Sequence, residues 1–100
     1  MIDITRALAI AGWMDPPDLE WLATAAGHAL RIVEIGSWKG RSTRALADHT
    51  DGVVYAIDPW SGRYLGANNR PLKLKLSVLP AFTEAMRDHI LTGRVVPMQA

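Results

Sequence analysis

The 100-residue chain has no cysteine, which excludes a disulfide framework, thiolate zinc sites, iron–sulfur ligation and a cysteine nucleophile. Net charge is also small. Eleven basic residues against ten acidic ones leave +1, without the electrostatic footprint of a nucleic-acid-binding or membrane-surface protein. No apolar run approaches the ~20 residues of a membrane span, and the amino terminus lacks the basic start and apolar run of a secretory signal. We therefore predict a cytoplasmic protein with neither nucleic acid nor membrane as partner.

The composition is that of a soluble globular protein, with 49% hydrophobic and 21% charged residues. A chain of this length forms one domain at most. We predict a single domain over residues 1–100, with N-terminal helices in residues 1–30 and a βαβαβ core in residues 31–100.

Helical signals occur in four segments of the chain. Asp15 is a good N-cap, Pro16 suits the first helical position, and Gly27 follows the last apolar position of that segment. Apolar spacing predicts one uninterrupted helix near the carboxyl end, with Gly93 as its C-cap. The predicted helices span residues 2–11, 16–26, 40–47 and 78–91.

Three short segments rich in β-branched residues alternate with these helices: Arg31–Ile35, Val53–Asp58 and Arg94–Met98. The first two are expected to be buried on both faces. Alternation of strands and helices predicts βαβ units and a parallel sheet, so the predicted fold class is Rossmann-like α/β, a three-stranded parallel sheet with flanking helices. Residues 60–71 are predicted to form a long irregular loop.

A glycine turn follows the first predicted strand, in the stretch Glu-Ile-Gly-Ser-Trp-Lys-Gly-Arg-Ser-Thr from Glu34 to Thr43. A dinucleotide fingerprint that starts at Gly36 would need glycines where the chain has Trp38 and Arg41. A phosphate loop with the same start would need Gly-Lys-Ser/Thr where the chain reads Arg-Ser-Thr. The spacing therefore argues against NAD, FAD, ATP and GTP.

An acid ends the second predicted strand. Asp58 lies 22 positions after Gly36, close to the ~20 positions at which an acid binds ribose hydroxyls in Rossmann folds. Turn and acid together predict an adenosine ligand that carries ribose but no pyrophosphate.

These two segments resemble the first two motifs of class I S-adenosylmethionine-dependent methyltransferases, closest to the macrocin O-methyltransferase-like and cephalosporin hydroxylase-like branch. The motifs are Val-Glu-Ile-Gly-Ser-Trp-Lys-Gly-Arg-Ser-Thr from Val33 and Val-Tyr-Ala-Ile-Asp-Pro-Trp from Val54. The resemblance runs roughly from Trp13 to the end and covers only the front half of the family's fold. It implies the cofactor-binding half of a small-molecule O-methyltransferase. The fourth-strand motif, where many such enzymes place catalytic or metal-binding carboxylates, is not among these residues.

The resemblance implies S-adenosylmethionine as cofactor and a small-molecule methyl acceptor as substrate, with no catalytic residue assigned. In the family the glycine turn approaches the methionine and ribose portion, and the acid before it steadies the cofactor's amino end through the loop. Trp60 follows Asp58 closely enough to pack on adenine. The expected cofactor-binding residues are Glu34, Gly36, Ser37, Gly40, Asp58 and Trp60.

Each of these residues also has a purely structural interpretation. The glycines suit a ligand-free turn, Asp58 can cap the turn before Pro59, Glu34 can bond nearby backbone, and Trp60 can cover a loop. No two of the three histidines have metal-ligand spacing, so no metal site is predicted. The alternative function is a non-catalytic Rossmann-like module whose open strand edge, Ile32–Ile35, is completed by self-association.

Overall fold

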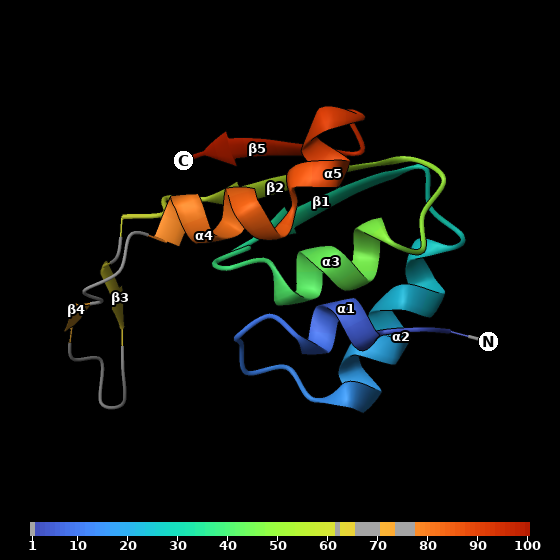
Figure 1. The fold of residues 1–100 in the computed structure, drawn as a ribbon, viewed down its shortest axis with the longest axis horizontal. Coiled ribbons are helices and arrows are strands. Elements are labelled where there is room, and N and C mark those ends of the chain that lie inside the picture. Colours follow the sequence, from blue (N-terminus) through green and yellow to red (C-terminus); the bar gives the residue numbers. More distant parts are fainter. Residues whose placement is uncertain (1, 62, 66–70, 74–77) are drawn as a thin grey trace.

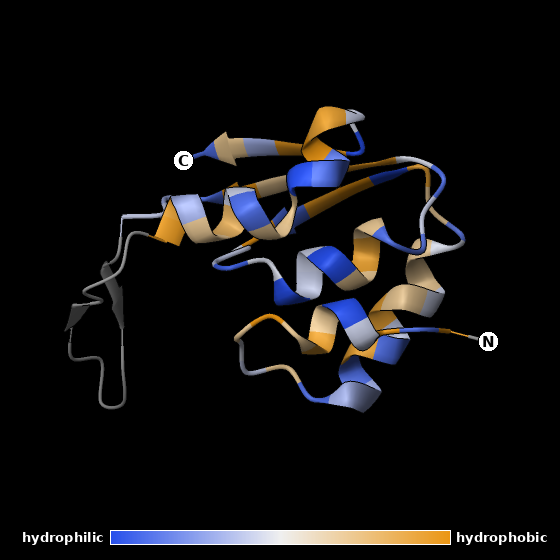
Figure 2. Cartoon of the chain, viewed as in Figure 1, coloured by the Kyte–Doolittle hydropathy of each residue, from blue (hydrophilic) through white to orange (hydrophobic). Residues whose placement is uncertain are grey.

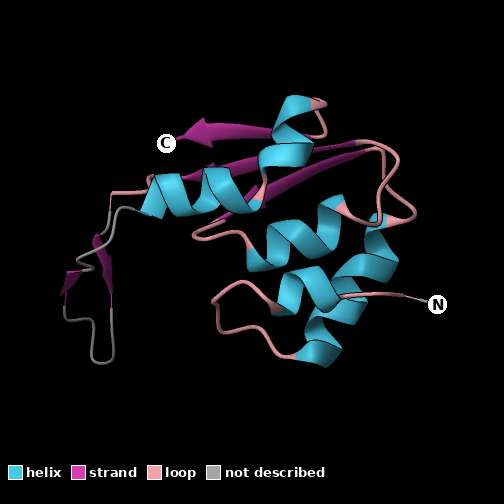
Figure 3. Ribbon diagram, in the orientation of Figure 1, coloured by secondary structure: helices cyan, strands magenta, loops and turns pink. Residues whose placement is uncertain are grey.

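The structure is a computed structural model that describes residues 2–61, 63–65, 71–73 and 78–100 (Figure 1). The helices are α1 (Thr5–Leu8), α2 (Pro16–Ala26), α3 (Arg41–Ala47), α4 (Val78–Ala85) and α5 (Arg87–Leu91). The strands are β1 (Arg31–Ile35), β2 (Val53–Asp58), β3 (Arg63–Leu65), β4 (Pro71–Lys73) and β5 (Val95–Gln99) (Figure 3).

The main sheet has the order β1-β2-β5, and both pairings are parallel. Val33 pairs with Tyr55, which in turn pairs with Val96, so each row crosses all three strands. The predicted α/β class with a three-stranded parallel sheet is therefore confirmed. The carboxyl ends of all three strands lie at the same end of the sheet, which we call the carboxyl edge. Ligands bind there in open α/β sheets.

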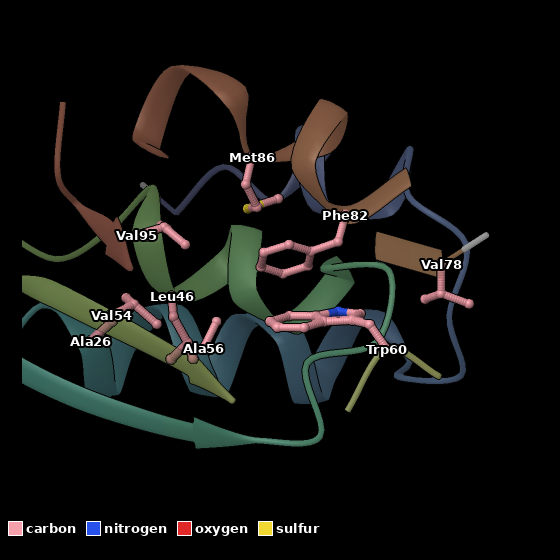
Figure 4. Packing of buried hydrophobic residues seen from close by; sticks show 10 residues of the cluster. Ala26, Leu46, Val54, Ala56, Trp60, Val78, Phe82, Met86 and Val95 are labelled. Carbon is pink, nitrogen blue, oxygen red and sulfur yellow. The ribbon is translucent and has the colours of Figure 1, made fainter. Parts of the chain in front are cut away.

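The helices lie on one face of this sheet in two layers (Figure 1). Helix α3 packs on β2 and α5 on β5, while α1 and α2 pack on the far side of α3. The core beneath the sheet contains Val54, Ala56, Phe82 and Met86, all fully buried (Figure 4). A second, smaller core lies between α1, α2 and α3. The molecule thus has three layers: the sheet, the helices that pack on it, and helices α1 and α2 beyond α3.

Two predicted helices differ from the observed ones. The N-terminal helix is only four residues long, Thr5–Leu8, and Asp3 Oδ1 accepts the N–H of its first residue, Thr5 (2.9 Å). The predicted helix over residues 78–91 is interrupted at Met86. In a continuous helix the Ala85 carbonyl would accept the N–H of His89; here it accepts Arg44 Nη1 (3.0 Å). A side chain inserted into the helical ladder is a known cause of such breaks.

The burial on both faces predicted for β1 and β2 was wrong, because helices cover only one face of the sheet. The side chains of β2 alternate between half-buried and buried. Those of β1, an edge strand, alternate between exposed and half-buried. The predicted irregular loop over residues 60–71 was also wrong in part, since Arg63–Leu65 pairs antiparallel with Pro71–Lys73. Residues 62 and 66–70 of that segment lie outside the described residues. No helix among the described residues is long and apolar enough to span a membrane.

Candidate functional site

The turn after β1 stands at the carboxyl edge of the sheet. The N–H of Gly36 donates to the Ile57 carbonyl (2.7 Å), and the N–H of Gly40 donates to the Ser37 carbonyl (2.9 Å). Gly36 has φ +86°, and no atom of the described residues lies within 4 Å of the position that a Cβ would take. The backbone at Gly36 is therefore in a conformation that favours glycine and faces free space.

The second glycine of the turn has a different environment. Gly40 has φ +99° and is the N-cap of α3. A Cβ at this position would stand 3.2 Å from both Met86 Cε and Phe82 Cδ2. The absence of a side chain at Gly40 therefore lets the turn approach the core side chains of Phe82 in α4 and Met86 at the start of α5. Among the described residues, these two contacts explain through packing why a glycine stands at this position.

The acid before the turn joins β1 to α3. Glu34 Oε2 accepts the hydroxyl of Ser42 (2.5 Å), and Oε1 accepts the hydroxyl of Thr43. Thr43 is fully buried. A half-buried carboxylate in an apolar strand needs such donors, because burying a charge without hydrogen bonds is unfavourable. Both oxygens thus hold the first turn of α3, and Glu34 reaches the Gly36 turn only through this helix.

Asp58 holds two loops together at the end of β2. Its carboxylate is 2% exposed. Oδ1 accepts the N–H of Trp38 in the glycine turn (3.3 Å), and Oδ2 accepts the N–H of Trp60 (2.7 Å). These contacts match the interpretation of Asp58 as a cap of the turn before Pro59. They also show that Asp58 caps the glycine turn after β1. In this arrangement the carboxylate is closed off from a ribose.

Trp60 also joins the two loops that Asp58 holds together, and we call this arrangement the clamp. Its indole Nε1 donates to the Trp38 carbonyl (2.8 Å), and its ring packs on Phe82 with centroids 4.9 Å apart (Figure 4). The residue is 5% exposed. Trp38 and Trp60 have φ of +49° and +44°, values that are strained for bulky residues and recur at functional sites. Trp60 is therefore a core residue in this arrangement, with its ring away from any open ligand space.

Ser37 lies between the two glycines and is 3% exposed. Its hydroxyl has no hydrogen-bond partner among the residues that the structure describes. A buried hydroxyl without a partner is uncommon, because its desolvation is not compensated. A ligand group would find room beside Gly36, and the neighbouring Ser37 hydroxyl is a donor that this arrangement leaves covered and unused among the described residues.

Sequence reasoning missed Trp38 as the centre of the site. Its ring stacks on Trp13 with centroids 4.3 Å apart, and Lys39 Nζ lies 4.7 Å from its centroid. Its N–H and carbonyl bind Asp58 and Trp60. No sequence signal joined Trp13 to the glycine turn.

No protein-family model and no curated protein matches this chain. The methyltransferase resemblance of the two motifs therefore stays a proposal. Among the described residues, no three His, Asp or Glu side chains are grouped so that they could hold a metal ion.

The strongest charge cluster lies at the other end of the sheet. Arg44, buried in α3, forms a bidentate ion pair with Asp88 (2.6 and 2.8 Å) and a second pair with Asp48 (3.1 Å). This guanidinium holds the pKa of Asp88 well below its usual range. His89 Nε2 lies 2.7 Å from Asp48 Oδ1. A cavity of about 640 Å³ opens beside this cluster and includes no residue of the Gly36 turn.

Proposed function

We propose that this chain binds S-adenosylmethionine at the carboxyl edge of its sheet, as the cofactor-binding half of a small-molecule O-methyltransferase. The observation that carries the proposal is the Gly36–Ser37 step. Free space at a left-handed glycine adjoins a buried hydroxyl that lacks a partner among the described residues. Both follow the first strand of a parallel sheet, where nucleotide-type ligands bind. Both pairings of the sheet are parallel, so the carboxyl ends of all three strands lie together at this location.

The contacts refine the role of each proposed residue. Gly36 would let the backbone approach the cofactor, and Ser37 would offer its hydroxyl. Glu34 would position the turn through α3, and Gly40 would do so by packing on α4. Asp58 is 2% exposed and would accept ribose hydroxyls only after its carboxylate is uncovered, since the bond from the Trp60 N–H fills only one of several acceptor positions. Packing of Trp60 on adenine likewise requires the ring to leave Phe82.

S-Adenosylmethionine would supply an electrophilic methyl group, and transfer would depend mainly on positioning of the methyl acceptor. The described residues offer this reaction a cradle, and the proposal assigns no catalytic residue. A protein of this kind would hold the cofactor, while activation of the acceptor hydroxyl would come from groups outside those described.

Isothermal titration calorimetry with S-adenosylhomocysteine tests the proposal. Gly36→Ala adds a methyl group where the cofactor would approach, and we expect at least a tenfold loss of affinity. Gly93→Ala is a matched control, because Gly93 has φ +80° and free space around it but follows α5, away from the turn. The control should bind as the parent does. Absence of binding heat from the parent protein, or equal losses in both variants, would refute the proposal.

The second candidate is a non-catalytic module completed by pairing at the β1 edge. The N–H of Gly36 and the carbonyl of Leu30 bind β2, so the even-numbered residues of β1 face β2. The N–H and C=O groups of residues 31, 33 and 35 therefore point to the open edge. Unpaired edges of this kind favour pairing with another strand. Light scattering that shows a dimer, together with calorimetry that shows no binding of S-adenosylhomocysteine, would favour this candidate.

A further inference from the structure

The cavity of about 640 Å³ beside the Arg44 cluster is polar on most of its walls. The walls come from α1 and the residues before it, the end of α3, α5, and Arg94 just before β5. Figure 2 shows hydrophilic residues in each of these three helices. Charged and titratable side chains make up most of the lining, so the cavity suits a charged ligand better than an apolar one.

Arg94 is a cation in this lining that has no partner. The residue is half-buried, and its guanidinium forms no hydrogen bond or ion pair with the part of the chain that the structure describes. By contrast, Arg44 binds the carboxylates of both Asp48 and Asp88. A guanidinium presents five N–H donors in a fixed fork that matches an oxyanion. Arg94 therefore has its donors available for a ligand.

Two histidines in the lining each have one ring nitrogen available. His49 Nδ1 donates to the Ala45 carbonyl (2.8 Å), which leaves Nε2. His89 Nε2 lies 2.7 Å from Asp48 Oδ1, which leaves Nδ1. Neither remaining nitrogen has a partner among the residues described. On a neutral imidazole such a nitrogen is an acceptor, whereas protonation makes it a donor with positive charge.

These two histidines decide the sign of the charge in the cavity. Three guanidiniums and three carboxylates line it or adjoin it, and they balance one another: Arg6, Arg44, Arg94, Asp3, Asp48 and Asp88. Carboxylates and guanidiniums ordinarily keep their charges between pH ~5 and ~8, while histidines change theirs. The cavity is therefore close to neutral when both imidazoles are neutral and gains two positive charges when both are protonated.

We propose that this cavity binds a divalent tetrahedral oxyanion, held by Arg94 and by the protonated imidazoles of His49 and His89. The two charges gained on protonation match the two charges of the ligand. The carboxylates leave room for an anion, because each is already engaged. Asp48 and Asp88 bind Arg44, and Asp3 accepts the N–H of Thr5. Because binding takes up protons, it should strengthen as pH falls.

Titration with sodium sulfate at constant ionic strength, followed by two-dimensional ¹H–¹⁵N NMR, tests the proposal. Sulfate keeps both of its charges between pH ~5.5 and ~8, the range in which histidines titrate. Amide shifts should be grouped at residues 47–49 and 88–94, and affinity should be at least tenfold higher at the lower pH. Acetate, a carboxylate with one charge, should bind at least tenfold more weakly than sulfate at pH ~5.5.

Three variants separate this site from general charge effects. Arg94→Gln should weaken sulfate binding at least tenfold at pH ~5.5. Arg31→Gln is the matched control, because Arg31 is exposed at the start of β1 and outside the cavity lining, and it should bind as the parent does. His49→Gln should reduce the difference in affinity between the two pH values. Circular dichroism confirms that each variant is folded.

Four outcomes would overturn the proposal. They are an absence of grouped shifts at pH ~5.5, equal sulfate affinity at both pH values, equal losses in the two arginine variants, and acetate binding as tight as that of sulfate. Because the cavity includes no residue of the Gly36 turn, none of these outcomes bears on the binding of S-adenosylmethionine.

Discussion

Replacement of Asp58 by alanine should destabilise the fold, because this carboxylate joins two loops. The substitution leaves two N–H groups without their acceptor. Trp60 N–H lies in a buried residue and bonds at 2.7 Å, so its loss should cost ~2–3 kcal/mol, the range for bonds to charged groups. The bond from Trp38 N–H is longer, at 3.3 Å, and should contribute ~1 kcal/mol.

Relief of backbone strain offsets part of this loss. Both tryptophans have positive φ, and conformations of this kind cost on the order of 1 kcal/mol or more each. Without the carboxylate, the two residues can relax towards ordinary φ values. We therefore expect a net loss of ~1–2 kcal/mol in the free energy of unfolding. A domain of this size is stable by ~5–15 kcal/mol, so the variant should still fold.

Urea denaturation followed by far-ultraviolet circular dichroism measures the effect. Asp58→Asn keeps one carbonyl oxygen as acceptor and should lose about half as much stability as Asp58→Ala. Asp51→Ala is the control, because Asp51 is exposed in the turn before β2 and should change stability by less than ~0.5 kcal/mol. A loss below ~1 kcal/mol in Asp58→Ala would show that the carboxylate does not hold the two N–H groups, and the clamp described above would be wrong.

Other expected outcomes concern the core and the charge cluster. Arg44→Met removes a buried guanidinium that binds two carboxylates and should cost ~2–4 kcal/mol in urea denaturation, whereas Arg87→Met, on the exposed side of α5, should be nearly neutral. Because Arg44 lowers the pKa of Asp88, its stabilisation is present above the ordinary pKa of ~3.9 and is lost as pH falls below it. Denaturation at pH ~3 and ~7 should therefore show a smaller pH effect in Asp88→Asn than in the parent; equal effects would contradict this. Gly40→Ala should lose more stability than Gly36→Ala, since both strain the backbone but only the first also meets the side chains of Phe82 and Met86. Equal losses in thermal denaturation would refute the packing role of Gly40.

Local signals in the sequence predicted most of the elements correctly. The Asp15-Pro16 start, the glycine at position 27 and the β-branched segments located α2, β1 and β2, because capping and strand propensity act between neighbours in the chain. The break at Met86 was not predictable in this way. It depends on Arg44, 41 positions earlier in the chain than the carbonyl it binds.

The candidate site was predicted as a set of residues but not as an arrangement. Gly36, Ser37 and Asp58 do meet at the carboxyl edge of the sheet, which the parallel topology requires. Sequence spacing could not show that Trp38 and Trp60 engage both oxygens of Asp58, because that depends on two loops folding onto one another. Nor could it show that β1 is exposed on one face, since apolar residues in a strand look the same whether or not a helix covers them.

The position of strand β1 at the edge of the sheet has a consequence for amide hydrogen exchange. Its N–H groups alternate between those bonded to β2, at residues 32, 34 and 36, and those that point to the open edge, at residues 31, 33 and 35. In the isolated monomer, exchange along this strand should therefore alternate between slow and fast, while β2, paired on both sides, is slow throughout. A neighbouring strand would remove the alternation, whereas a molecule packed on the face of the sheet that no helix covers would leave the edge amides without partners. The amides of residues 31–36 thus record which side of the sheet meets another molecule.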